Sequence, residues 1–233
     1  MSEAAELVFL LDVDNTLLDN DRFAEDLGDT LAQAFGAAER DRYWRLYEQL
    51  RDESGYADYL GALQPFRIGL GNERALLQMS EYLLEYPFAE RLYPHALETI
   101  AHLRTLAPTV ILSDGDVVYQ PRKLQLSGIW SAVDGEVLIY VHKQRMLVAM
   151  QQRYPAAHYV MVDDKPHLLA AMKQQLGAQL ITVFVRQGHY AAASESESIV
   201  PAPDLTIACI DELRGRKLED FLPRASVIPL AAD

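Results

Sequence analysis

The chain has 233 residues, half of them hydrophobic, and a formal net charge of −13 at pH 7. This length accommodates one α/β domain with an insertion, or two small domains, and the apolar fraction is sufficient for a sizeable core. The negative charge argues against DNA or RNA as the main partner, because nucleic-acid phosphates require a basic surface. A small phosphorylated ligand, held by a few local groups, is still compatible with this charge.

The cysteine content and the amino-terminal residues bear on the cellular compartment. Cys209 is the only cysteine, so no intramolecular disulfide can form, and a reducing compartment is indicated. Its apolar surroundings predict that it is a small buried residue. The first residues lack the basic start of a secretory signal, and no apolar run reaches about 18 residues. We therefore expect a cytoplasmic protein with no membrane partner; nothing in the sequence defines an oligomeric state.

The first apolar run, residues 7–11, leads directly into two acidic residues. The stretch from 7 to 17 reads L-V-F-L-L-D-V-D-N-T-L, which is typical of a buried strand of a parallel sheet followed by a turn. Because side chains alternate along a strand, Asp12 and Asp14 are expected to project to the same side. Two neighbouring carboxylates with little solvent repel each other, so a divalent cation is predicted there. The alternative is a pair of solvated loop acids.

Residues 18–92 have a different character. Phe23, Leu27, Leu31 and Phe35 recur every four residues, and further helical patterns follow at 43–50 and 76–84, whereas no strand pattern is found. Glycines and a proline between residues 55 and 71 predict turns in the middle of the segment. The segment contains 8 Arg, no Lys and 15 acidic residues. We expect an all-helical insertion between the first strand and the rest of the chain.

From residue 93 onward, apolar runs alternate with helical patterns. Strands are predicted at 109–112, 137–141, 158–162, 180–185 and 205–208, and helices at 94–106, 117–126, 143–154 and 166–176. The Ser-, Ala- and Pro-rich residues 188–203 predict a loop. This alternation indicates βαβ units and therefore a doubly wound parallel sheet.

Polar side chains follow the carboxyl ends of the predicted strands. Because these ends meet at the ligand-binding edge of a doubly wound sheet, we expect the side chains to converge. Oxygen ligands without a His/Cys cluster favour Mg²⁺. The residues concerned are Asp12, Asp14, Thr16, Ser113, Asp114, Lys143, Asp163 and Asp164.

This constellation resembles the haloacid dehalogenase-like hydrolase superfamily, in its Mg²⁺-dependent phosphatase branch. The four motifs of that family occur in order: D-V-D-N-T at 12–16, Ser113 in L-S-D-G, Lys143, and Asp163-Asp164 after V-M-V. The helical segment lies where the family has its first type (C1) of cap domain. The resemblance implies a Rossmann-like α/β core from residues 1–17 and 93–233, with a helical cap at 18–92.

The resemblance also implies an activity, a Mg²⁺-dependent phosphomonoester hydrolase that acts on a small phosphorylated metabolite through an aspartyl-phosphate. Asp12 would be the nucleophile, Asp14 the general acid and base, and Lys143 the charge that steadies Asp12. The implied phosphate-binding residues are Thr16, Ser113, Asp114 and Lys143. The implied metal-binding residues are Asp12, Asp14 (through its backbone carbonyl), Asp163 and Asp164.

Several alternatives are left open by the sequence. Lys123 also lies between the second and fourth motifs, but Lys143 follows a strand twenty residues before Asp163, and Lys123 is expected on a solvated helix face. A phosphomutase, a phosphorylation switch or a catalytically silent binding or scaffold protein could use similar residues. Carbon–halogen dehalogenases of the family lack an acid at the position of Asp14. Phosphonate-cleaving members use a cap lysine, which residues 18–92 do not contain.

Overall fold

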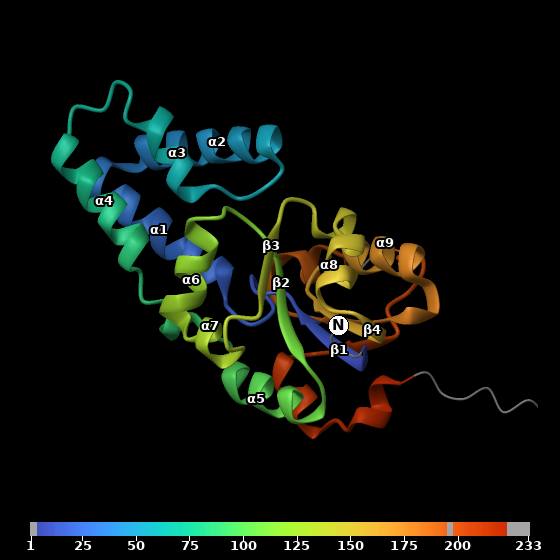
Figure 1. Ribbon diagram of the computed structural model, residues 1–233. Helices are drawn as coiled ribbons and strands as arrows, with labels where there is room; N and C mark the ends of the chain where they lie inside the picture. The colour runs from blue at the N-terminus through green and yellow to red at the C-terminus, as the bar shows by residue number, and fades with distance from the viewer. Residues whose placement is uncertain (1–3, 195–197, 223–233) are drawn as a thin grey trace, which may run out of the picture.

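The computed structural model of the protein describes residues 4–194 and 198–222, and these contain one six-stranded sheet (Figure 1). All pairs of neighbouring strands are parallel, in the order β3-β2-β1-β4-β5-β6. This order is that of a doubly wound, Rossmann-like sheet, so the predicted fold class is confirmed. The strands are β1 Ala5–Leu11, β2 Thr109–Asp114, β3 Val137–Tyr140, β4 Ala156–Asp163, β5 Leu180–Val185 and β6 Leu205–Ile207.

Helices cover both faces of the sheet, which explains why its strands are continuous apolar runs. Along β1, Leu7 and Phe9 contribute to one hydrophobic core, and Val8 and Leu10 to the other. The first core is closed by α5 (Ala96–Leu106), α7 (Ile129–Ala132) and the 3₁₀ helices η5 (Ile210–Gly215) and η6 (Leu218–Phe221), and the second by α8 (Leu147–Arg153) and α9 (Pro166–Leu176).

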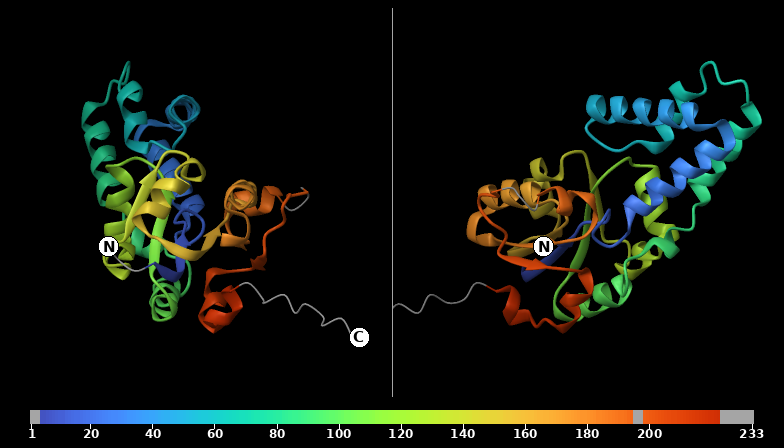
Figure 2. Two further views of the ribbon diagram at one scale, coloured as in Figure 1. Left: turned by 45° about the vertical axis from the view of Figure 1, so that its right-hand side comes forward. Right: turned by 180° about the vertical axis from the view of Figure 1, so that it is seen from behind.

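Residues 18–92 form the helical insertion, whose helices gather outside the sheet at one end of the molecule (Figure 2). The chain leaves and re-enters the core side by side, because Leu18 forms an antiparallel bridge with Leu92. Whether the insertion is a separate domain stays a prediction. Its elements are α1 Asn20–Phe35, α2 Ala37–Ser54, α3 Tyr59–Phe66, α4 Glu73–Glu85 and the 3₁₀ helix η1 Phe88–Arg91.

Helix α3 was not predicted, because it contains Gly61 and Pro65, two residues with low helix propensity. Its amino terminus is capped by Asp58, whose carboxylate accepts a hydrogen bond from the Gly61 N–H. Its apolar residues Tyr59 and Phe66 are buried against the other insertion helices. Burial of this face therefore outweighs the unfavourable local propensity.

Two further expectations were wrong. Part of the predicted 188–203 loop is a short helix, α10 (Gly188–Ala193), in which Ala191 is buried. Cys209 is exposed, because it lies between the end of β6 and the buried Ile210 at the start of η5. Among residues 4–194 and 198–222, no helix combines the length and the apolar character that crossing a membrane requires.

Candidate active site

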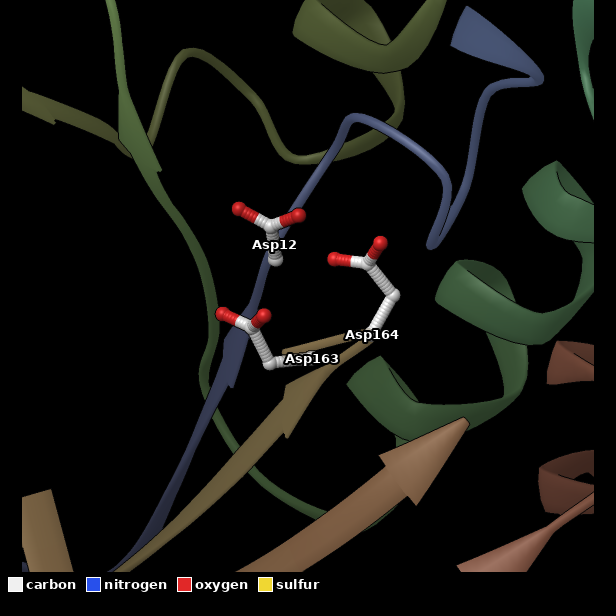
Figure 3. A group of neighbouring side chains, drawn as sticks. All are labelled: Asp12, Asp163 and Asp164. Atoms are coloured by element: carbon white, nitrogen blue, oxygen red, sulfur yellow. The ribbon is translucent and has the colours of Figure 1, made fainter. Parts of the chain in front are cut away.

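The site lies where the strand order reverses, between β1 and β4. Leu11 of β1 is paired with Val162 of β4, so the residues that follow them, Asp12 and Asp163, emerge side by side at the carboxyl ends of the strands. Asp164 comes next in the chain. Figure 3 shows the three carboxylates gathered in one place, and each offers an oxygen within 4.8 Å of the others.

Lys143 supplies a positive charge to this cluster. It belongs to the 3₁₀ helix η2 (Lys143–Arg145) after β3, and its side chain is 1% exposed. The Nζ atom donates to Asp12 Oδ1 and lies 2.7 Å from Asp163 Oδ2. Burial alone would lower the pKa of Lys143, but the charges of Asp12 and Asp163 outweigh it and raise the pKa above its usual value. Lys143 is therefore a buried ammonium group between two carboxylates.

Asp164 receives the charges of Lys165 and Lys143 only from a distance. Both of its carboxylate oxygens are buried, and neither accepts a hydrogen bond from any residue that the structure describes. Burial, followed by the charge of Asp163, raises its pKa. A buried carboxylate without donors is costly, whereas a hard divalent cation with oxygen ligands would satisfy it. The residues present thus fit a metal ion held between Asp12, Asp163 and Asp164.

The remaining predicted residues surround the cluster. Thr16 Oγ1 lies 3.3 Å from Asp12 Oδ2, to which it donates. Asp114 Oδ1 accepts a 2.6 Å hydrogen bond from the Lys143 N–H, and burial raises its pKa. Ser113 is buried and accepts a 3.0 Å hydrogen bond from the Gln120 side chain. The structure thus brings the residues predicted for the site to one edge of the sheet, although they span more than 150 positions.

The expectation for Lys123 was wrong. It lies in α6 (Tyr119–Ser127), its side chain is 1% exposed, and its Nζ lies 2.7 Å from Asp14 Oδ1. Gln120, one turn earlier, places its Nε2 3.3 Å from Asp14 Oδ2. Lys123 and Gln120 fall on the same side of the helix as Tyr119 and Leu124, but this spacing alone does not predict burial, because a lysine in a helix is usually solvated.

Lys165 was also missed as a site residue. Its backbone N–H donates to Asp163 Oδ1 at 2.9 Å. Burial would lower the pKa of its side chain, but the charges of Asp12, Asp163 and Asp164 raise it. A cation that directly follows an acidic pair at a strand end is the signal that could have identified it.

A cavity of about 330 Å³ lies between the core and the helical insertion. Asp14 and Lys165 line it from the core, and Trp44, Arg51 and Tyr59 line it from the insertion. A ligand in this cavity would therefore contact both parts of the chain.

The turn after β1 is held by Asn15, which adopts φ = 60°. Its Oδ1 accepts hydrogen bonds from the N–H groups of Asn20 and Asp21, at 3.0 and 3.2 Å. Gly188 (φ = 70°) packs directly against it, and a Cβ at Gly188 would lie 2.5 Å from the Asn15 Cβ. The turn that carries Asp12 and Asp14 thus depends on a glycine far away in the sequence.

Gly188→Ala is therefore expected to destabilise the protein more than Gly69→Ala does. Gly69 also has a positive φ (78°), but nothing lies within 4 Å of a Cβ there, so its substitution costs only the backbone strain, about 1–2 kcal/mol. Gly188→Ala adds the collision with Asn15. Urea unfolding of both variants measures the difference, and equal losses would contradict the assigned packing.

A doubly wound sheet with Asp12, Lys143 and an Asp163-Asp164 pair at its switch point is the architecture of the haloacid dehalogenase-like hydrolases. The profile of that family matches residues 7–175, so the chain belongs to the haloacid dehalogenase-like hydrolase family, and the protein is a hydrolase. The family predicted from the motifs is confirmed.

Solved structures of the same fold agree with this assignment. A protein from Burkholderia xenovorans LB400, assigned to the haloacid dehalogenase-like hydrolases, is 53% identical, with a TM-score of 0.85 over 92% of this chain and 98% of its own. The L-2-haloacid dehalogenase from Xanthobacter autotrophicus is 19% identical (TM-score 0.57, 89% and 96% covered). The HAD-hydrolase YfnB from Bacillus subtilis, solved bound to magnesium, is 20% identical (TM-score 0.54, 91% and 97% covered). No curated protein matches the sequence.

Proposed function

We propose that the protein is a Mg²⁺-dependent phosphomonoester hydrolase that acts on a small phosphorylated metabolite. The observation that carries the proposal is the buried cluster of Asp12, Asp163 and Asp164, with the Lys143 ammonium against two of them and Asp164 without a donor among the described residues. Such a cluster combines a carboxylate nucleophile with the positive charge that a phosphate dianion needs for approach.

The residues that would hold Mg²⁺ are the side chains of Asp12, Asp163 and Asp164 and the backbone carbonyl of Asp14. When bound, the ion offsets the negative charge of the nucleophile and of the phosphoryl oxygens. Lys143 offsets part of the negative charge of Asp12 whether or not the ion is bound, because its ammonium group contacts Asp12 directly.

The chain's own residues carry the reaction in two steps. The Asp12 carboxylate attacks phosphorus, the ester P–O bond breaks, and Asp14 gives its proton to the leaving oxygen, which departs as an alcohol. A water molecule then gives a proton to Asp14 and attacks phosphorus, and the bond to Asp12 breaks, which restores both carboxyl groups and releases inorganic phosphate. Thr16 supports Asp12, and Ser113 would donate to a phosphoryl oxygen.

The helical insertion would serve as the cap in this reaction. Its residues Trp44, Arg51 and Tyr59 line the same cavity as Asp14, so they would contact the alcohol portion of the ester and exclude bulk water. The cavity volume of about 330 Å³ supports a small metabolite as the substrate.

Asp14 favours ester hydrolysis over carbon–halogen cleavage. An alkoxide leaving group needs a proton, whereas a halide ion does not, and Asp14 lines the cavity two residues after Asp12. Transfer of the phosphoryl group to a second substrate hydroxyl, as in a mutase, would use the same first step.

The test is hydrolysis of p-nitrophenyl phosphate by the wild type and by Asp12→Asn, with Mg²⁺ and with EDTA. We expect turnover that requires Mg²⁺ and disappears in Asp12→Asn, because an amide cannot form the aspartyl-phosphate. Asp204→Asn, which removes a carboxylate bound to Lys173 and Thr182, is the control and should be active.

Two results would contradict the proposal. One is equal activity of Asp12→Asn and wild type; the other is halide release from an L-2-haloacid with no phosphate release from any ester in a metabolite panel. Phosphoryl transfer to a hydroxyl, without free phosphate, would identify a mutase instead.

A further inference from the structure

Helix α6 buries two polar side chains that both reach Asp14, a residue of the opposite loop. Lys123 Nζ lies 2.7 Å from Asp14 Oδ1, and Gln120 Nε2 lies 3.3 Å from Oδ2. The same Gln120 nitrogen donates to Ser113 Oγ at 3.0 Å. Residues three apart on a helix share one face, so this face of α6 is aimed at the Asp14 carboxylate and at a phosphate-binding candidate.

The Lys123 ammonium is enclosed by aromatic rings. Its Nζ lies 5.6–6.0 Å from four ring centroids, within the range of cation–π attraction. Such rings exclude water, so the Lys123 ammonium is held by its polar partners Asp14 and Asn20 rather than by solvent. The rings belong to Phe23, Tyr59, Phe88 and Tyr119.

Lys123 also connects Asp14 to the helical insertion. Its Nζ donates to Asn20 Oδ1 at 3.1 Å, and Asn20 is the first residue of α1. Asn20 in turn donates to the Tyr59 hydroxyl of α3 at 3.2 Å. The Asp14 carboxylate is thus tied, through one ammonium group, to two helices of the insertion.

Fold stability does not explain this arrangement. A buried ion pair recovers little more than its desolvation cost, and an apolar side chain of similar volume often stabilises as well or better. A methionine has a similar length and no charge to desolvate. The Asp14 side chain is 23% exposed and lines the cavity, so it would be hydrated without Lys123. The pair therefore calls for an explanation other than fold stability.

We propose that Lys123 is a positioning residue that fixes the Asp14 carboxylate at the cavity wall and couples its orientation to the docked helical insertion. The inference rests on the proposed function, because Asp14 needs a fixed orientation only if it transfers a proton at the ester oxygen. Removal of Lys123 leaves Asp12, Lys143 and the metal-binding carboxylates in place, so substrate binding should change less than turnover.

The test compares Lys123→Met, Lys123→Arg and Lys173→Met with the wild type on phenyl phosphate and p-nitrophenyl phosphate. Phenolate needs a proton on departure more than p-nitrophenolate does. Lys123→Met should therefore lower kcat for phenyl phosphate by about 10- to 100-fold, lower it less for the nitrophenyl ester, and leave KM within about twofold. Lys123→Arg should recover part of the loss, and Lys173→Met, which removes a remote pair with Asp204, should match the wild type.

The melting temperature and a double variant with Asp14→Asn distinguish a positioning role of Lys123 from a structural one. The melting temperature of Lys123→Met should equal or exceed that of the wild type, and the substitution should cause no further loss of turnover in an Asp14→Asn background. A lower melting temperature with equal losses on both esters, or unchanged turnover on both, would overturn the proposal.

One measurement does not depend on activity. A crystal structure of Lys123→Met should show the Asp14 carboxylate in a different side-chain rotamer, and an unchanged rotamer would overturn the proposal even if turnover fell. Wild-type protein without Mg²⁺-dependent phosphate release from either phenyl ester or from any ester of the metabolite panel would refute the proposed function, whereas the Asp14 rotamer would still decide the role of Lys123.

Discussion

Replacing Lys143 by methionine is expected to abolish phosphate-ester hydrolysis and to lower the free energy of unfolding by about 3–5 kcal/mol at neutral pH. Its ammonium contacts both Asp12 and Asp163, and its removal leaves two buried carboxylates facing each other. Because the folded-state pKa of Lys143 lies above its usual value, its contribution is complete at neutral pH and is lost only as the pH rises beyond about 10.4.

In Lys143→Met the pH dependence moves to Asp163. Burial raises the pKa of Asp163 even beside Lys143, and loss of the lysine removes the largest opposing effect, so the folded variant binds a proton that the unfolded chain does not hold. The stability deficit should therefore shrink as the pH falls from neutral towards about 4, the unfolded-state carboxyl pKa. Urea unfolding in EDTA at a series of pH values measures this change.

Lys173→Met is the matched control for this prediction. It also removes a Lys–Asp pair, with 2.8 Å between Lys173 Nζ and Asp204 Oδ2, but one that is partly exposed. Its removal should cost at most about 1 kcal/mol and leave hydrolysis intact. If both variants lost similar stability, the pairing of Lys143 with two buried carboxylates would be contradicted.

The sheet was predictable from the sequence because its strands are buried on both faces. Residues 180–185 were assigned as a strand and form β5 with the same bounds, since a parallel strand needs little beyond its own apolar run. Helix α3 was not predictable, because Gly61 and Pro65 oppose a helix locally. Its stability comes from contacts of Tyr59 and Phe66 with helices elsewhere in the insertion, which no local pattern encodes.

The two buried lysines, Lys143 and Lys123, also differ in how far the sequence predicts them. Lys143 could be assigned because it follows β3, and the carboxyl ends of parallel strands meet at one edge. Lys123 lies within a helix, where a lysine is usually solvated. Its burial depends on Phe23, Tyr59 and Phe88, which belong to the insertion and are brought to α6 only by the tertiary fold.

Asp164→Asn should change the stability of the metal-free and the metal-bound protein in opposite directions. In EDTA we expect the free energy of unfolding to rise by about 1–3 kcal/mol, because a buried carboxylate without a donor among the described residues is replaced by a neutral amide. With Mg²⁺ at about 100 times its Kd, the wild type should gain about 2.7 kcal/mol, and the variant should gain much less.

The stability difference between Asp164→Asn and the metal-free wild type should also depend on pH. Burial, and then the charge of Asp163, raise the pKa of Asp164. The protonated Asp164 side chain is compatible with the folded state below the unfolded-state carboxyl pKa, and the wild type loses stability as the pH rises from there through the folded-state pKa. The advantage of Asp164→Asn over the wild type in EDTA should therefore grow with pH. Thermal unfolding with EDTA and with Mg²⁺, at several pH values, tests both expectations.

The control variant Asp204→Asn should show the opposite pH dependence of stability. Burial alone would raise the pKa of Asp204, but hydrogen bonds from Lys173 and Thr182 lower it, so its contribution is present above the unfolded-state pKa and is lost as the pH falls. Its replacement should destabilise the protein equally with and without Mg²⁺. If Asp164→Asn also destabilised the metal-free protein, Asp164 would have a donor in solution and would belong to the fold. If Asp164→Asn stabilises the metal-free protein and reduces the stabilisation by Mg²⁺, the Asp164 carboxylate binds a cation. It then lowers the stability of the metal-free protein.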